Sequence, residues 1–155
     1  MSQNVIYFED MNADLKVDSP DRVVTSADIE RFADLTGDTN PLHVDDTYAA
    51  ESRYGERIAH GALILSLATG MAYRMETFSQ SVETITDVKW KFRHPVYIGD
   101  RIRARFAFRR KHSMPGYHGG LVVFDVEMRN QHNEVVQEGR WRLMVRNKPK
   151  TTPTT

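Results

Sequence analysis

A carboxylate and an imidazole lie five residues apart in the segment Thr36-Gly37-Asp38-Thr39-Asn40-Pro41-Leu42-His43. Glycine favours the end of a helix and proline cannot continue one, so the segment is predicted to be an ordered loop. Histidine exchanges protons near neutral pH, and a nearby carboxylate can hold the water molecule on which it acts. Asp38 and His43 therefore have the chemistry to add water to a polarised double bond, or to remove it.

A second motif, Ile58-Ala59-His60-Gly61, precedes a mainly apolar helix predicted over residues 60–75. The first N–H groups of a helix lack partners within it, and the helix dipole favours negative charge there. Glycine also permits close approach of a ligand. The Gly61 N–H is therefore the candidate donor to a developing oxyanion, worth roughly 3–4 kcal/mol in a transition state. For His60 we expect a hydrogen bond that shapes this turn.

The elements that must position these residues come first in the chain. A short strand is predicted over 22–25, and a helix capped by Ser26 over 26–35. The loop over 36–45 leads into a short helix that begins at residue 46 or 47 and ends near 52. Residues 1–20 are predicted to be an irregular lead-in.

After residue 80 the hydrophobic period changes from that of a helix to two, which is typical of half-buried antiparallel strands. Four such strands contain Trp90, Phe106, Phe124 and Trp141, and turn sequences separate them. Helices followed by a four-strand meander predict an α+β fold, with a curved sheet covering the long helix. We expect one domain over 1–155 with a disordered tail over 147–155.

The composition narrows the class of protein. The 155 residues are 40% hydrophobic and 27% charged, with a formal net charge of +0, which is typical of a globular chain and predicts neither nucleic acid nor a membrane as partner. There is no cysteine, which excludes disulfides and thiolate chemistry and fits a reducing compartment. The N-terminus has no signal-peptide pattern, and the longest apolar stretch, 61–71, is far shorter than a membrane span of roughly 20 residues. A cytoplasmic location is predicted.

Three segments resemble one known family. They are 32–43, Ser52-Arg53-Tyr54-Gly55 with the Ile58–Gly61 motif, and the strand and turn over 92–100. Together they resemble the MaoC-like, (R)-specific enoyl-CoA hydratases and dehydratases, over roughly residues 20–146. The resemblance implies a hot-dog fold, a homodimer or dimer of dimers, and a substrate that is an acyl-CoA or acyl-carrier-protein thioester. It implies no cofactor apart from the coenzyme A of the substrate, and a role in fatty acid metabolism.

The resemblance also implies roles for individual residues. Asp38 and His43 would hold one catalytic water, which adds syn to give the (R)-3-hydroxyacyl product, and Gly61 would bind the thioester oxygen. Asn40, His60 and Arg53 are predicted to be substrate-binding residues, and the side-chain hydrogen bonds of Asn40 should also help to shape the loop. A hydroxyl of the long helix, from Ser66 or Thr69, would support the site, although both can instead bond back to helical carbonyls.

Several basic residues could contact a phosphate of coenzyme A, although each of them could instead be a solvated surface residue. They are Arg53, Arg57, Lys89, Lys91, Arg93, Arg109 and Lys111. Residues at the end of the long helix could limit acyl chain length, namely Tyr73, Arg74, Met75 and Phe78, and Arg74 would suit an acidic substrate.

Two other functions compete with the hydro-lyase. A thioesterase of the same fold would use a carboxylate to activate water at the carbonyl, and a non-catalytic subunit would only bind acyl thioesters. The Asp-x-Asn-Pro-Leu-His arrangement favours the hydro-lyase over both. Since fold alone does not determine function, the site must decide. No residues with metal-ligand spacing are found, so no metal site is expected.

Overall fold

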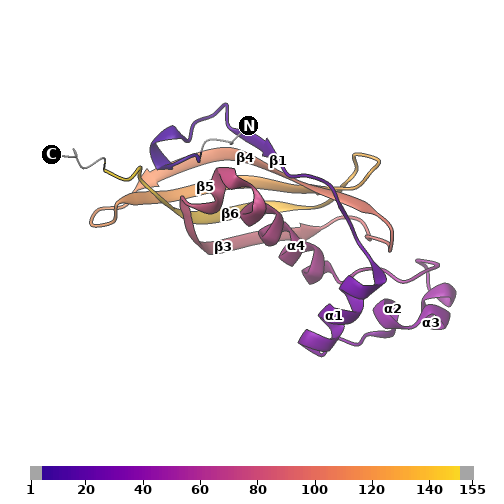
Figure 1. Ribbon diagram of the computed structural model, residues 1–155. Coiled ribbons are helices and arrows are strands. Elements are labelled where there is room, and N and C mark those ends of the chain that lie inside the picture. Colours follow the sequence, from indigo (N-terminus) through magenta and orange to yellow (C-terminus); the bar gives the residue numbers. More distant parts are fainter. Residues whose placement is uncertain (1–4, 151–155) are drawn as a thin grey trace.

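Four long strands form most of a curved antiparallel sheet in the computed structural model, which describes residues 5–150 (Figure 1). They are β3 (Val82–Phe92), β4 (Arg101–Ser113), β5 (Gly119–Arg129) and β6 (Val135–Arg146). The order along the sheet is β1-β4-β5-β6-β3, where β1 is Lys16–Asp18, and the short β2 (Arg22–Val23) also pairs with β4. The predicted α+β class is confirmed. The predicted simple meander is wrong for β3, which pairs with β6 at the sheet edge instead of with β4.

The alternating apolar residues of the sheet form its core. Phe106, Phe124 and Trp141 are each at most 2% exposed, and the rings of Phe106 and Trp141 pack edge to face. Edge-to-face contacts of this kind add to the free energy gained by burial of apolar area. The period of two therefore predicted correctly which face of β4, β5 and β6 is buried.

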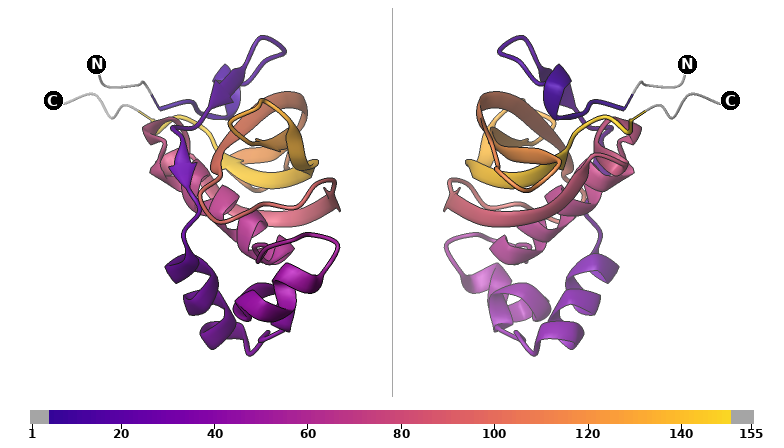
Figure 2. Two further views of the ribbon diagram at one scale, coloured as in Figure 1. Left: turned by 90° about the vertical axis from the view of Figure 1, so that its right-hand side faces the viewer. Right: turned by 90° about the vertical axis from the view of Figure 1, so that its left-hand side faces the viewer.

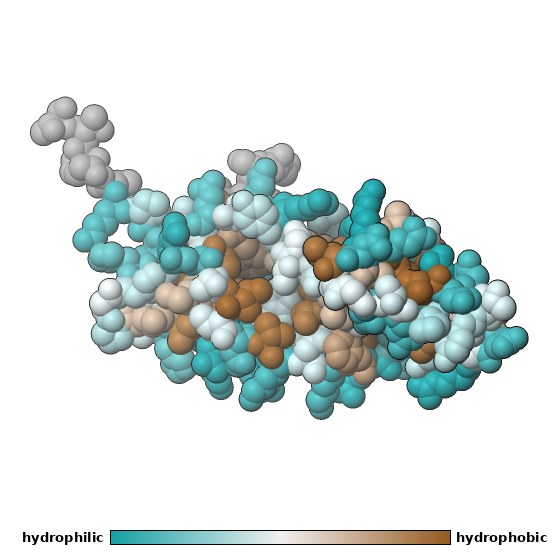
Figure 3. Space-filling view, turned by 90° about the horizontal axis from the view of Figure 1, so that it is seen from below, coloured by the Kyte–Doolittle hydropathy of each residue, from teal (hydrophilic) through white to brown (hydrophobic). Residues whose placement is uncertain are grey.

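The edge strand β3 departs from this pattern. Val88 and Phe92 occupy the apolar positions of the alternation, yet they are 38% and 61% exposed. Figure 3 shows apolar side chains gathered on the side of the molecule where β3 and the long helix lie. Within the described part of this chain, no second layer covers this strip.

The long helix α4 (Gly61–Arg74) packs only one side against the sheet. Leu63, Ile64, Ala68 and Met71 are buried. The opposite side is exposed and carries mostly small residues, namely Ala62, Ser66, Thr69 and Gly70. The sequence predicted the helix and its bounds to within a residue, and the sheet covers the side of the helix that carries its buried residues. A one-turn helix, α5 (Glu76–Ser79), follows.

The N-terminal lead-in is more ordered than predicted. Phe8, in a short 3-10 helix (Phe8–Asp10), and Met11 belong to the hydrophobic core at 8% and 1% exposure. The C-terminal segment 147–155 was predicted to be a disordered tail, but its first residue is ordered. The Asn147 N–H donates to the His118 carbonyl oxygen at 2.8 Å. Residues 151–155 of that predicted tail lie outside the described residues.

Three short helices form a lobe beyond the N-terminal end of α4 (Figures 1 and 2). They are α1 (Ser26–Thr36), α2 (Pro41–Val44) and α3 (Asp46–Glu51). The cap of α1 is Thr25 and not the predicted Ser26, since the Thr25 hydroxyl accepts from the Asp28 N–H while the Asp28 carboxylate accepts from the Thr25 N–H. The predicted loop 36–45 contains α2, because proline is well suited to the first position of a helix.

None of the described helices is both long enough and apolar enough to cross a membrane.

Candidate active site

A series of local hydrogen bonds fixes the backbone around Asp38. Gly37 ends α1 in the left-handed region with φ +77°, which glycine adopts without strain. The Asp38 N–H then donates to the Thr36 hydroxyl, and one Asp38 carboxylate oxygen accepts from the Asn40 N–H at 3.3 Å. Asn40 in turn caps α2. The predicted role of Asn40 in shaping the loop is thus supported by its contacts, and the Asp38 side chain remains exposed to solvent.

His43 lies on α2, half-buried, with a defined tautomer. Its Nδ1 lies 2.7 Å from the carbonyl oxygen of Ile58, and a carbonyl can only accept a hydrogen bond. The neutral ring therefore carries its proton on Nδ1 and leaves the Nε2 lone pair free. The Ile58 N–H donates a hydrogen bond to the Leu42 carbonyl oxygen, and the Ala59 N–H donates to the Val96 carbonyl oxygen. These two bonds hold the Ile58 carbonyl in place.

His60 is buried at 2% exposure between two rings. Its centroid lies 3.9 Å from that of His43 in a stacked contact and 4.9 Å from that of Phe32. Its Nε2 lies 2.9 Å from the Asp38 carbonyl oxygen. His60 therefore ties the Asp38 backbone to the start of α4 through this hydrogen bond.

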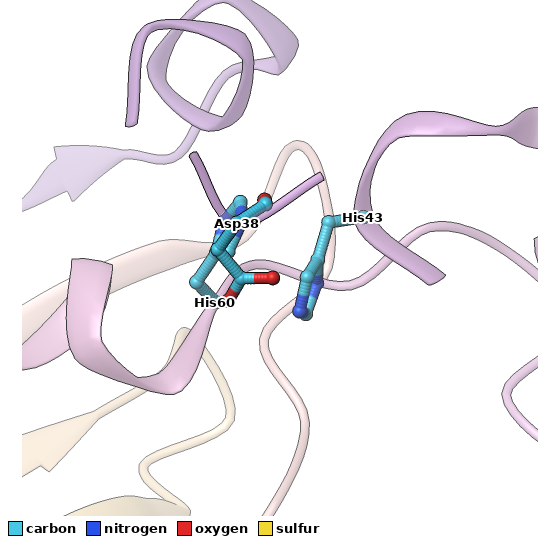
Figure 4. A group of neighbouring side chains, drawn as sticks. All are labelled: Asp38, His43 and His60. Carbon is cyan, nitrogen blue, oxygen red and sulfur yellow. The ribbon is translucent and has the colours of Figure 1, made fainter. Parts of the chain in front are cut away.

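Figure 4 shows the Asp38 carboxylate pointing toward the His43 ring. One carboxylate oxygen of Asp38 and one ring nitrogen each of His43 and His60 all lie within 4.8 Å of one another. A water that makes hydrogen bonds of about 2.8 Å to two groups can bridge a gap of this size.

Residues of these three types also bind divalent metals. However, the two rings are stacked, with 29° between their planes. An ion in the plane of one ring would lie outside the plane of the other. The sequence-based expectation that no metal binds here stays a prediction.

The first turn of α4 opens into a cavity of about 460 Å³ that also contains His43 and Arg53. Among residues 5–150, the N–H groups of Gly61 and Ala62 have no hydrogen-bond acceptor. The backbone at Gly61 is covered closely by the Phe92 ring, which would lie 2.8 Å from a Cβ atom at this position. Glycine is thus required here for close packing, and the cavity brings free donors and the His43 imidazole together.

The basic residues divide according to their partners. The Arg53 guanidinium is exposed on the rim of this cavity, where it lies against Tyr54 and meets no carboxylate of the described chain. Arg57, by contrast, is only 10% exposed, pairs with Asp46 at 2.7 Å and donates to the His43 carbonyl oxygen at 3.3 Å. Arg57 therefore holds the lobe together and is not a free phosphate ligand.

Ser66 and Thr69 do not line the His43 cavity. Their hydroxyls donate to the carbonyl oxygens of Ala62 and Ser66 along the helix. Thr69 lines a second, mainly apolar cavity of about 220 Å³, together with Tyr73 and Phe78. A substrate-binding role for either hydroxyl stays a prediction.

Two residues of the site were not singled out from the sequence. Phe92 covers Gly61, and Gln137 lines the cavity while buried at 2% exposure. The sequence did indicate that Gln137 is buried, because it alternates in step with the inward-facing Trp141, Leu143 and Val145 of the same strand. A polar residue at an inward position needs hydrogen-bond partners.

Comparison with known proteins now identifies the family. A family model described as "MaoC like domain" matches residues 10–120, which is well over half of the chain. The chain belongs to the MaoC-like domain family. One relative of this MaoC-like protein is the 3-hydroxybutyryl-CoA dehydratase of Methylorubrum extorquens, with 32% identity over 111 residues, 65% of this chain and 62% of the relative. The chain spans 31% and 62% of the lengths of the first two curated relatives that it matches.

Solved structures agree on the fold of the MaoC-like chain. The monoamine oxidase regulatory protein from Archaeoglobus has 34% identity and a TM-score of 0.81, covering 96% of this chain and 99% of that one. A Mycobacterium tuberculosis protein described as a double hot-dog fold has 19% identity and a TM-score of 0.82, covering 97% of this chain and 47% of that one. This MaoC-like protein therefore has the predicted hot-dog fold.

Proposed function

We propose that this MaoC-like protein is a hydro-lyase that adds water to a 2-enoyl thioester, or removes it from the 3-hydroxyacyl form. The observation that carries the proposal is that His43 and the first turn of α4 line one cavity, while a carboxylate oxygen of Asp38 lies within 4.8 Å of a His43 ring nitrogen. The groups available for the reaction are therefore the Asp38 carboxylate, the free Nε2 of His43, and the unpaired N–H groups at the start of α4. Membership of a family that contains a protein named as a dehydratase supports the same reaction class.

In the proposed reaction, Asp38 and His43 hold one water molecule between them. His43 Nε2 accepts a proton as the water oxygen bonds to C3, and the electron pair of the double bond moves to the thioester oxygen. The Gly61 N–H donates to that oxygen, with the α4 dipole favouring its negative charge. The dyad then delivers a proton to C2, which completes the addition with atoms and charge in balance.

We also propose that the product is the (R)-3-hydroxyacyl thioester. Both protons and the oxygen come from the side of the substrate that faces the dyad, so the addition is syn. This part rests on the sequence resemblance of residues 32–43 to (R)-specific hydratases. It can be checked separately, by measuring dehydration of (R)- and (S)-3-hydroxybutyryl-CoA.

The substrate class is inferred from the two cavities. The exposed guanidinium of Arg53 on the rim of the His43 cavity suits a phosphate of coenzyme A or of a carrier-protein prosthetic group. The apolar cavity beside Thr69 begins eight residues along α4 from Gly61, which is about 12 Å at 1.5 Å per residue. Its Tyr73 and Phe78 walls suit an acyl chain, whereas Arg74 is not among its lining residues.

We further propose that the protein is a cytoplasmic homodimer. An uncovered edge strand with exposed Val88 and Phe92 is a pairing liability unless another chain covers it. The small residues on the exposed side of α4 would allow close approach of a second copy. The lack of cysteine in the sequence is consistent with a reducing compartment.

The test of function is the absorbance of the enoyl-thioester band of crotonyl-CoA. We expect wild-type protein to remove the band, and Asp38→Asn and His43→Gln to do so at least 100-fold more slowly. If free thiol appears while the double bond persists, the protein is a thioesterase. If 2-enoyl thioesters from four to twelve carbons bind but do not react, it is a non-catalytic binding subunit.

A further inference from the structure

Gln137 places a buried amide between the sheet and the first turn of α4. Its Nε2 donates to the Gly61 carbonyl oxygen at 3.1 Å, and its Oε1 accepts from Trp90 Nε1 at 2.7 Å. An indole N–H can only donate, so Trp90 determines which end of the amide faces which partner. Both ends of this side chain are therefore used.

The orientation of the amide is set by the sheet itself. Gly139 pairs with Trp90 across the strands, and a Cβ atom at Gly139 would lie 2.7 Å from the indole ring. Because glycine has no side chain, the indole lies across β6, where its N–H reaches Gln137. The amide is thus held in one orientation by residues of β3 and β6.

The carbonyl that Gln137 contacts belongs to the peptide unit between Gly61 and Ala62. A peptide unit is planar, so holding its carbonyl oxygen also fixes the direction of the Ala62 N–H. A hydrogen bond to the carbonyl also polarises the peptide and strengthens its N–H as a donor. Ala62 and Gln137 both line the cavity that contains His43.

We propose that Gln137 is a positioning residue, which holds the Gly61–Ala62 peptide so that the first-turn N–H groups of α4 bind the thioester oxygen. This inference rests on the hydro-lyase function proposed above. An apolar side chain would be the ordinary choice at an inward strand position, since a buried amide loses its hydration. The two hydrogen bonds of Gln137 offset that loss, and the one to Gly61 acts directly on the peptide beside the reaction.

The test compares Gln137→Met with Val136→Ala. Methionine fills a similar volume but cannot donate to Gly61, while Val136 is fully buried on the same strand and none of its hydrogen bonds reach α4. We expect Gln137→Met to lower kcat for crotonyl-CoA hydration by tenfold or more with KM changed less than threefold. We expect Val136→Ala to lower thermal stability without such a loss of kcat. A wild-type kcat in Gln137→Met, or an equal loss in both variants, would overturn the inference.

A second measurement separates this inference from the proposed function. The amide resonance of Ala62 in an NMR spectrum of the substrate-free protein should shift in Gln137→Met and remain in place in Val136→Ala. An unchanged resonance in Gln137→Met overturns the positioning role. If wild-type protein does not hydrate any enoyl thioester, the proposed function fails, whatever the Ala62 resonance shows.

Discussion

His43 donates its Nδ1 proton to the carbonyl oxygen of Ile58 at 2.7 Å, which leaves Nε2 as the only basic nitrogen of the neutral ring. Asparagine at position 43 can place an amide N–H near the position of Nδ1 but has no atom at Nε2. We therefore expect His43→Asn to keep the thermal stability of the wild type within a few degrees. Its hydration rate should fall 10²–10⁴-fold, because the general base is lost. Activity within tenfold of wild type would show that another group is the base.

Gly61→Ala tests the close packing at the start of α4. The new Cβ would lie 2.8 Å from the Phe92 ring, so we expect Phe92 to move and the melting temperature to fall. Adding Phe92→Ala should raise the melting temperature again, since it removes both ring carbons that would lie 2.8 Å from the new Cβ. Hydration should stay low in the double variant, because the added methyl group still narrows the cavity that Gly61 and His43 line. Recovery of the rate in the double variant would contradict this role of Gly61.

Arg57→Met should destabilise the α1–α3 lobe. It removes a 2.7 Å ion pair with Asp46 and a hydrogen bond to the His43 carbonyl, both made by a guanidinium that is 10% exposed. We expect the free energy of unfolding in urea to fall by about 1–3 kcal/mol. The hydration rate should also fall, because α2 carries His43.

Arg53→Met is the matched control for that measurement. Arg53 is exposed and meets no carboxylate of the described chain, so we expect the urea midpoint to be unchanged. Instead, the KM for crotonyl-CoA should rise. The KM for a crotonyl thioester that lacks the nucleotide should not rise. Equal effects on both thioesters would exclude a phosphate contact at Arg53.

The pH dependence of stability should reflect the pair that joins β1 to β4. The Arg105 guanidinium, which donates to the Asp18 carboxylate at 2.7 Å, lowers the pKa of that carboxyl. A carboxyl whose pKa is lower in the folded state stabilises the fold above its unfolded pKa of about 3.9, and this contribution is lost as the pH falls through the folded value. Both side chains are partly exposed, so the contribution is about 0.2–1 kcal/mol. Between pH 5 and 2, urea denaturation of Asp18→Asn should therefore show a shallower loss of stability than the wild type, and parallel curves would contradict this.

Val88→Asp tests the proposed homodimer. Val88 is 38% exposed on the edge strand β3, where a charge would be buried without a partner if a second copy covered it. Sedimentation should give a mass of 17.9 kDa for the variant and twice that value for the wild type. A dimeric variant would show that the two copies meet at another surface.

The sequence was sufficient for much of the fold. Alternation around Phe106, Phe124 and Trp141 correctly predicted the buried face of three strands, and the apolar run after Gly61 predicted α4. These features follow from the spacing of apolar residues within one segment, and that spacing can be read directly from the sequence. The pairing of β3 with β6 was missed, because several pairings satisfy the same alternation and only the packing of the whole sheet distinguishes them.

For the candidate site, the sequence by itself determined the chemistry that is available, namely the Asp38 carboxylate, the His43 imidazole and the free N–H of Gly61. Only the tertiary structure decided how these groups are held. The tautomer of His43 depends on Ile58, fifteen residues away, and the Gly61 carbonyl is held by Gln137, seventy-six residues away. Hydrogen bonds between segments so far apart leave no periodic pattern in the chain, because they form only when folding brings the lobe, α4 and β6 together.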